Sequence, residues 1–547
     1  MYNKLNRSLP PVPVSNFSMV PRSDVPRSKF RSESAYRTTF DADFLIPVFV
    51  EEVLPGDHFH INATCFMRMG TPIFPIMDNV YLDAFFFFVP NRINWTNWVK
   101  FMGEQTNPAD TISYTIPQLA STLNGGFAVN SLGDYFGLPV VGTQVTVQPF
   151  VNALPFRAYN DIWNEWFRDQ NLQNSAFILT DGSTSGEANY PLLKRNKRPD
   201  YFTSSLPWPL KGGVSVPIPF AGTAAVKTGV VPGLPTGAQA AINILRSDTG
   251  GSFAGGQTLG VGLAGNAGTA GAPASTTNVA SWYPSNLYAD LSTATGATIN
   301  SMRLAVATQQ FLEKDARGGT RYTELLRNHF GVAPQDSRLQ RPEYCGGGSF
   351  MLQTQAIPQT APTTGPVSPL GTLAGATIGS GQISASYAAA EHGFIMGLVA
   401  VRADITYQQG IHRMWTRTTR FDYYFPTFAF LGEQVVRQDE IYATGVIATD
   451  TAAFGYQERW AEYRYRPGRI TGKFRGNIAG TFAPWTLSQY FSTPPALNTV
   501  FITSNTPMTQ VLAAGASTGN QFLFDSVWHV TATRPLPARS VPGLARF

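Results

Sequence analysis

Residues 80–89 constrain the fold more than any other part of this sequence. Four consecutive phenylalanines, at positions 85–88, stand in an apolar run that ends at Pro90. A short continuous run of β-branched and aromatic residues is typical of a strand that is buried on both faces. We therefore expect a sheet that packs on another sheet, or a sheet that is covered by a neighbouring molecule.

Further strand patterns lie on both sides of this run. Residues 44–50, 58–69, 399–407, 421–431 and 521–530 are predicted strands, and alternation at 399–407 indicates one face in water. The 50 Gly and 40 Pro of the 547 residues disfavour a helical protein. An all-β fold follows, either an eight-stranded jelly roll or another two-sheet sandwich. Because such a roll needs far fewer residues, large inter-strand loop insertions are expected.

Helices are predicted only as short inserts. Aromatic side chains recur at helical spacing in residues 95–102, 159–167 and 322–330. We interpret these stripes as packing faces. The roll is then expected in two parts, 41–220 and 301–533, with a loop at 356–390 in the second part.

The N-terminal segment 1–40 is basic and rich in proline. It holds seven basic and two acidic residues, a net +5 that equals the formal charge of the whole chain. The prolines favour an extended path, either as a disordered tail or as an arm over a neighbour or over nucleic acid. Residues 534–547 form a second basic, extended tail. The candidate nucleic-acid contacts in the arm are Arg7, Arg22, Arg27, Lys29, Arg31 and Arg37.

Residues 221–300 differ from the rest in composition. This window is rich in Gly and Ala and holds only four charged residues. It is either a mobile surface loop or a large excursion that orders against its own copies around a symmetry axis. Charged residues make up only 14% of the whole chain, against roughly 25% in ordinary soluble proteins. A surface of that kind is expected where neighbouring copies cover it.

The sequence offers little for an enzyme or a membrane protein. Cys65 and Cys345 are too few for a structural zinc site, and no secretory signal or membrane-spanning run is present. His58 and His60 share one strand face, as in jelly-roll metalloenzymes of the cupin type, but the Glu that such sites need is missing. No cofactor is predicted. A cupin-like metalloenzyme and a bacterial surface β-adhesin are the alternatives, and an adhesin would need an export signal.

Two further basic clusters are candidate sites. Four residues combine cations with an aromatic ring and have no acid before Asp422, which suits stacking and phosphate contact with single-stranded nucleic acid: Arg413, Trp415, Arg417 and Arg420. In a second set, acids stand close to arginines, which favours ion pairs between subunits: Glu458, Glu462, Arg464 and Arg466.

Several long strings then match a known family in the right order. They include LPGD at 54–57, LPFRAYNDIWNEWFR at 154–168, DYFTSSLP at 200–207, EKDARGGTRYTE at 313–324 and FGYQE at 454–458. The chain resembles the major capsid proteins of microviruses, the gokushovirus subfamily in particular. Only residues 221–300 and 356–390 lack matching strings.

The resemblance implies an eight-stranded viral jelly roll. Sixty copies, as pentamers, would form a T=1 icosahedral shell around circular single-stranded DNA, assembled in the cytoplasm of a host bacterium. The 221–300 insertion would build protrusions at the threefold axes, which contact a receptor on the bacterial surface. Sixty copies at +5 carry about 300 charges, far fewer than the phosphates of a genome. Cations or a separate small basic protein must therefore neutralise the rest, and the resemblance implies such a DNA-binding protein, with other viral proteins, as partners in the virion.

Overall fold

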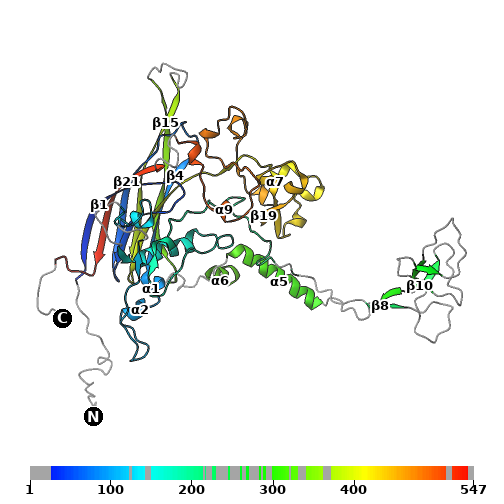
Figure 1. Ribbon diagram of the computed structural model, residues 1–547, viewed down its shortest axis with the longest axis horizontal. Coiled ribbons are helices and arrows are strands. Elements are labelled where there is room, and N and C mark those ends of the chain that lie inside the picture. Colours follow the sequence, from blue (N-terminus) through cyan, green and yellow to red (C-terminus); the bar gives the residue numbers. More distant parts are fainter. Residues whose placement is uncertain are drawn as a thin grey trace, which may run out of the picture. The chain divides into compact units, whose positions relative to one another are not determined.

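A computed structural model (Figure 1) describes residues 26–121, 126–141, 149–213, 216, 299–319, 322–330, 340–360, 371–512 and 520–539, with six short strands between 225 and 290. Two compact units are present. One combines Met1–Pro209 with Asp315–Phe547, and the other is Leu210–Lys314.

Eight long strands form the framework of the larger unit. They are β1 (Ser28–Phe40), β2 (Ile46–Val53), β3 (His58–Met69), β4 (Val80–Pro90), β14 (Glu343–Pro358), β15 (Leu373–Ala388), β16 (Gly393–Ala403) and β21 (Phe522–Arg534). Their order in the sheet is β1-β21-β3-β15-β14-β4-β16-β2. The first strand pairs with the last, the second with the seventh, the third with the sixth and the fourth with the fifth, always antiparallel. This nested pairing is that of a jelly roll, so the predicted fold class is confirmed.

Two long insertions separate these strands. Residues 91–342 lie between β4 and β14, and residues 404–521 lie between β16 and β21. The first insertion carries α1 (Asn91–Asn94), α2 (Trp98–Phe101), α3 (Leu132–Tyr135), α4 (Leu154–Ile162), α5 (Ile299–Gly318) and α6 (Tyr322–Phe330). The second carries α7 (Gln438–Ile441), α8 (Ile447–Asp450), α9 (Thr499–Ile502) and the strands β17 (Thr406–Tyr407), β18 (Glu433–Arg437), β19 (Ala453–Glu458) and β20 (Gly468–Arg469).

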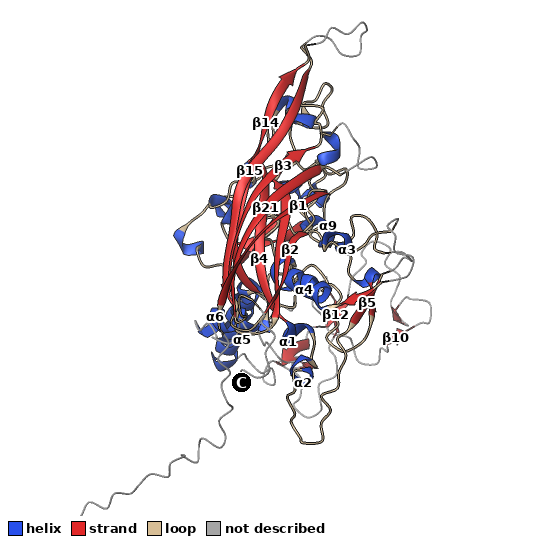
Figure 2. Cartoon of the chain, turned by 90° about the vertical axis from the view of Figure 1, so that its left-hand side faces the viewer, coloured by secondary structure: helices blue, strands red, loops and turns tan. Residues whose placement is uncertain are grey.

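Strands β3 and β4 differ in how many of their faces are buried. In β3, alternate side chains enter the core between the sheets while the others stay exposed. Strand β4 is covered on both faces, because Phe86 and Phe88 face that core while α4 and the π-helical turn after it cover the other face (Figure 2). The ring of Phe167 lies 5.2 Å from that of Phe85 and 6.0 Å from that of Phe87. The expected two-faced burial of residues 80–89 is confirmed.

Some expectations about individual segments were wrong. The predicted loop 356–390 contains β15, whose Gly, Ala and Ser residues conceal its strand character. Strand β16 is buried at every position, so residues 399–403 have no face in water. Residues 421–431 form 3₁₀ turns, not a strand. Residues 28–40 of the predicted arm are extended, as expected, but form the edge strand β1 of the roll.

The smaller unit contains three antiparallel two-stranded sheets. They pair β8 (Ala225–Thr228) with β13 (Leu287–Asp290), β9 (Ile244–Arg246) with β12 (Trp282–Pro284), and β10 (Leu259–Val261) with β11 (Ala267–Thr269). The pairs are nested in the sequence, with β10 and β11 innermost. It contains the 221–300 window, and its role as a protrusion stays a prediction. None of the described helices combines the length and apolarity that crossing a bilayer requires.

Candidate functional site

A cavity of about 560 Å³ opens in the insertion between β16 and β21. Its lining residues are His412, Met414, Arg417, Glu462, Tyr463, Arg466, Pro467 and Arg469. The cavity therefore unites residues of the two basic clusters that the sequence presented separately. Arg417 comes from the first cluster, and Glu462 and Arg466 come from the second.

Short elements of the backbone hold this wall in place. The 3₁₀ turn Arg413–Trp415 begins at His412, whose Nδ1 accepts a hydrogen bond from the Met414 N–H at 3.2 Å. Strand β20, which ends at Arg469, pairs with β17 in parallel. Trp460, eight residues before β20, adopts a left-handed φ of 67°. This residue starts the 3₁₀ turn Ala461–Tyr463, which contributes Glu462 and Tyr463 to the cavity.

The cavity carries more positive than negative charge. Arg417 Nη2 donates to Glu462 Oε1 at 3.0 Å, and Gln434 Nε2 donates to Glu462 Oε2 at 2.6 Å. The only carboxylate of the wall is thus fully engaged. Within the described part of the chain, Arg466 and Arg469 make no ion pair and no side-chain hydrogen bond. Burial, and then the positive charge of Arg469, lower the pKa of His412.

Other members of the predicted clusters are engaged elsewhere. Arg413 donates to the Val435 carbonyl at 2.7 Å and to Glu440 at 3.3 Å. Arg420 is exposed and lies over the ring of Phe421. Arg464 contacts Glu458 at 2.5 Å within the same chain. Glu458, Glu462 and Arg464 thus have partners within the same chain, and ion pairs between subunits at these residues stay a prediction.

The basic residues at the start of β1 lie on the exposed face of a sheet. Lys29, Arg31 and Arg37 alternate along β1, opposite Thr533, Thr531 and Asp525 of β21. Arg37 donates to Asp525 at 3.1 Å. Arg27 precedes the strand and is exposed. Arg7 and Arg22 lie outside the described residues.

The two histidines of the metalloenzyme alternative lie on the same exposed face. His58 stands between Thr533 and Ala388, and His60 stands between Thr531 and Ser386. Their cross-strand neighbours thus offer no carboxylate or further imidazole. Among the residues that the structure describes, no three His, Cys, Asp or Glu side chains are grouped as a metal site would need. Both cysteines are free.

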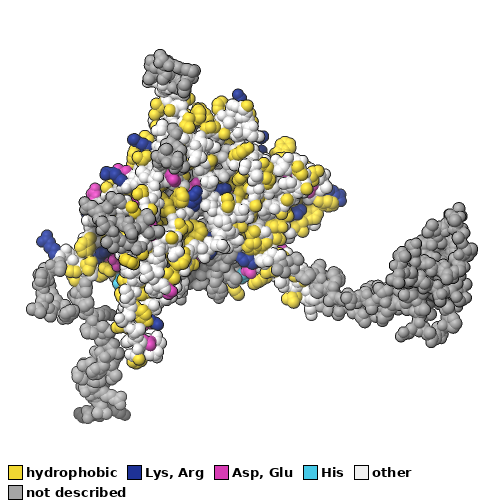
Figure 3. Space-filling view, in the orientation of Figure 1, with side chains coloured by type: hydrophobic (Ala, Val, Ile, Leu, Met, Phe, Trp, Pro, Cys, Tyr) yellow, Lys and Arg dark blue, Asp and Glu magenta, His cyan; other side chains and the backbone are white. Residues whose placement is uncertain are grey.

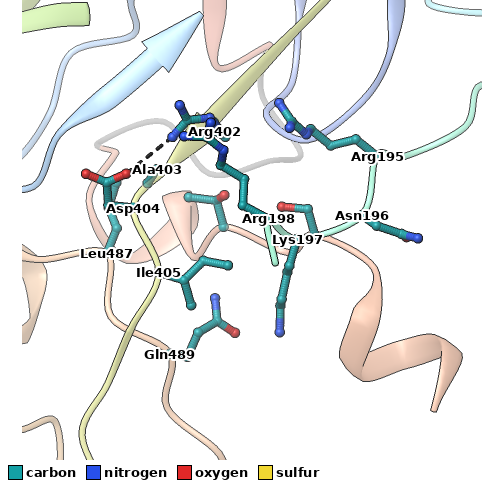
Figure 4. A pocket seen from close by; sticks show the side chains of 12 residues that line it. Arg195, Asn196, Lys197, Arg198, Arg402, Ala403, Asp404, Ile405, Leu487 and Gln489 are labelled. Atoms are coloured by element: carbon teal, nitrogen blue, oxygen red, sulfur yellow. Dashed lines mark hydrogen bonds and ion pairs between the residues drawn. The ribbon is translucent and has the colours of Figure 1, made fainter. Parts of the chain in front are cut away.

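A buried ionic cluster is centred on Asp83 of β4. Its carboxylate accepts hydrogen bonds of 2.7 Å from Arg195, Arg402 and Ser349. Figure 4 shows Arg402 from the end of β16 beside Arg195, with the ion pair from Arg402 to Asp404 dashed. Asp83 is absent from the residues predicted as sites, although an acid within the apolar run 80–89 is the signal that could have found it. This cluster ties the first insertion to the sheet and leaves little open space.

Large apolar side chains are exposed in residues 411–431, the segment that contributes His412, Met414 and Arg417 to the cavity. Phe430 is 99% exposed and Trp415 is 73% exposed. The same segment also exposes Ile411, Met414, Phe421, Tyr423, Tyr424, Phe425 and Leu431. Figure 3 shows hydrophobic side chains spread over the part of the molecule that carries α7 and β19. Exposed large apolar side chains gathered in one segment favour an interaction surface.

Comparison with known proteins agrees with this architecture. The sequence model of the family described as capsid protein (F protein) matches residues 18–544. Similar curated proteins are the capsid proteins VP1 of Bdellovibrio phage phiMH2K (43% identical over 538 residues; 96% of this chain and 97% of that one) and of Chlamydia phage 1 (39% over 613 residues; 99% of each). A third is capsid protein VP1 of Spiroplasma virus 4, 36% identical over 557 residues and 98% of each chain. The chain belongs to the capsid protein (F protein) family and is therefore a structural protein of the virus particle, not an enzyme.

Proposed function

We propose that this chain is the major capsid protein of a phage of the gokushovirus type. Sixty copies assemble, through pentamers, into a T=1 shell that encloses circular single-stranded DNA. The proposal is supported by the jelly-roll pairing of the eight strands and by full-length similarity to capsid proteins VP1. Closed point-group symmetry of identical copies is the ordinary outcome for a chain of this kind.

One observation carries the proposal of extensive self-association. The segment 411–431 exposes Phe430 almost completely and Trp415 to 73%, together with seven further large apolar side chains. A lone soluble protein rarely leaves such a patch in water. Contact with identical neighbours would bury this apolar surface. Each Å² that is removed from water stabilises the assembly by roughly 25 cal/mol.

The smaller unit suits a surface projection. Leu210–Lys314 is compact by itself and is inserted between β4 and β14. Three such units would meet at each threefold axis, where they would contact a receptor on the bacterial surface. The excess of charge of the chain, +5, leaves most genome phosphates unneutralised. A small basic DNA-binding protein in the virion, beside other viral proteins, would supply the missing charge.

Assembly of purified protein tests the proposal. We expect closed shells or pentamers in sedimentation and in negative-stain images, and a stable monomer at high concentration would contradict it. Phe430→Ser combined with Trp415→Ser should shift the protein to smaller species while its circular dichroism stays unchanged. The control is Val129→Ser, which removes an exposed apolar side chain far from this segment in sequence. Equal loss of assembly in the control would show that the aromatic segment is not the contact.

A further inference from the structure

The cavity between residues 412 and 469 has no role in holding the roll together. It lies in the second insertion, and its lining residues belong to none of the clusters of buried hydrophobic residues in the core. Its two outer guanidiniums, those of Arg466 and Arg469, are exposed. Because these two arginines of the wall make no buried contact, the cavity is a binding-site candidate.

The charges of this wall select an anion. Three arginines face one carboxylate, and that carboxylate already accepts hydrogen bonds from Arg417 and Gln434. The three arginines and one carboxylate leave the wall with a net charge of +2 when His412 is counted as neutral. Guanidinium groups present planar pairs of N–H donors that match the oxygens of phosphate. An anion in the cavity would bring these two guanidiniums the partners that the described chain does not provide.

The size and the apolar part of the wall narrow the choice of ligand. A volume of about 560 Å³ is much larger than one carboxylate side chain needs and falls in the range of sites for small organic ligands. Tyr463 and Met414 contribute apolar surface beside the arginines. Single-stranded nucleic acid is bound by this combination of basic groove and aromatic side chains.

Part of the wall is held rigid in advance. The guanidinium of Arg417 lies over the rings of Tyr463 and Tyr423, with 4.6 Å and 5.2 Å to their centroids. Its ion pair with Glu462 is almost fully buried. Tyr463 is thereby positioned before any ligand enters, and less conformational entropy is lost on binding.

We propose that this cavity binds a phosphodiester group of single-stranded DNA, held by Arg466 and Arg469, with the attached nucleoside against Met414 and Tyr463. The inference rests on the proposed function, because the packaged genome is the source of the DNA. It moves the nucleic-acid contact away from Arg413 and Arg417, which are engaged within the chain, to two arginines of which the sequence singled out only Arg466.

The test measures binding of a fluorescein-labelled oligothymidine to the unassembled full-length chain over a series of NaCl concentrations. For single-stranded DNA, each phosphate contact contributes roughly 0.7 to the slope of log affinity against log salt. Arg466→Gln with Arg469→Gln removes the contact with one phosphodiester group and should therefore lower the magnitude of the slope by about 0.7. Arg466→Lys with Arg469→Lys keeps the charge and should retain most of the slope.

The matched control is Arg420→Gln with Arg464→Gln, which removes the same charge from exposed residues outside the lining. We expect its slope to equal that of the unmodified protein. An equal fall in both double variants, or no fall in the cavity variant, would overturn the proposal.

Sedimentation of the same samples under assembly conditions separates this inference from the proposed function. A cavity variant that binds the oligonucleotide normally but fails to form shells would assign the cavity to an acidic side chain of a neighbouring copy. That result would overturn the DNA site and leave the capsid function intact. Failure of the unmodified protein to assemble would instead count against the proposed function.

Discussion

Arg417 Nη2 lies 3.0 Å from Glu462 Oε1, and the two side chains are only 6% and 3% exposed. The residues are 45 positions apart in the chain. Arg417 therefore belongs to a buried ion pair and not to an array of free cations. The pair builds the inner wall of the cavity and leaves the outer wall to Arg466 and Arg469.

Replacing Glu462 by Ala should destabilise the protein strongly. The guanidinium of Arg417 would stay buried without its counter-charge, and removal of one partner of such a pair costs about 3–5 kcal/mol. Urea unfolding of the unassembled chain, followed by tryptophan fluorescence, measures the change. The control is Glu458→Ala, whose partner Arg464 is half exposed and whose loss should cost about 0–1 kcal/mol. Similar losses in the two variants would contradict the burial argument.

Asp83→Asn should reduce the loss of folding stability that occurs when the pH falls into the acid range. Burial alone would raise the pKa of Asp83, but hydrogen bonds from Ser349, Arg195 and Arg402 outweigh it and lower the pKa below 3.8. A carboxyl group with a lowered pKa stabilises the fold above its unfolded pKa, and this contribution is lost as pH falls through the folded pKa. The unmodified chain should therefore lose stability below about pH 4.

The Asp83→Asn variant should start from a lower stability at neutral pH and lose less of it on acidification. Thermal unfolding of the unassembled protein between neutral pH and pH 3 provides the comparison. Asp404→Asn is the control, because Asp404 is half exposed and contacts Arg402 and the side chain of Asn79 but not Asp83. Parallel pH profiles for Asp83→Asn and the unmodified chain would show that another group controls the acid transition.

The sequence predicted several of the strands whose side chains are large. Residues 58–69 coincide with β3, and the phenylalanine run 80–89 lies within β4. Strand β15 escaped because its residues are small. Its glycines lie against large side chains of β14, such as Phe350 and Leu352. These residues of β14 supply the apolar surface where the two strands meet. Helix α5 escaped for a related reason, since Ala316 is its only buried residue and its apolar residues form no single face.

The candidate sites could be predicted only in part. The sequence identified Arg417, Glu462 and Arg466 as chemically notable, because cations, acids and aromatic residues cluster near them. It could not identify their partners, since the pairing of Arg417 with Glu462 depends on how the second insertion folds back on itself. Local patterns report which residues are charged, whereas tertiary contacts decide which charges are left free for a ligand.

Gly381→Ala tests the close packing of β15 against β14. A Cβ at Gly381 would overlap the ring of Phe350. Crowding of this kind costs about 1–3 kcal/mol, and urea unfolding should detect it. Combining the change with Phe350→Ala should remove the overlap with the ring and leave only the close contact with the Cβ of residue 350, so the two effects should not be additive. Gly186→Ala is the control, because its Cβ would meet no atom within 4 Å. Additive effects at positions 381 and 350 would contradict the predicted contact.

A triple substitution tests whether the exposed face of β1 contacts the genome. It replaces Lys29, Arg31 and Arg37. Changing all three to Gln removes about 180 positive charges from a shell of sixty copies, while their backbone pairing with β21 is unaffected because the side chains point outward. We expect shells in normal yield with less DNA in each, measured as absorbance at 260 nm relative to 280 nm in purified particles. Three exposed arginines away from β1, Arg327, Arg464 and Arg475, provide the matched control. Full DNA content in the β1 variant, or equal loss in the control, would place the contact elsewhere on the chain.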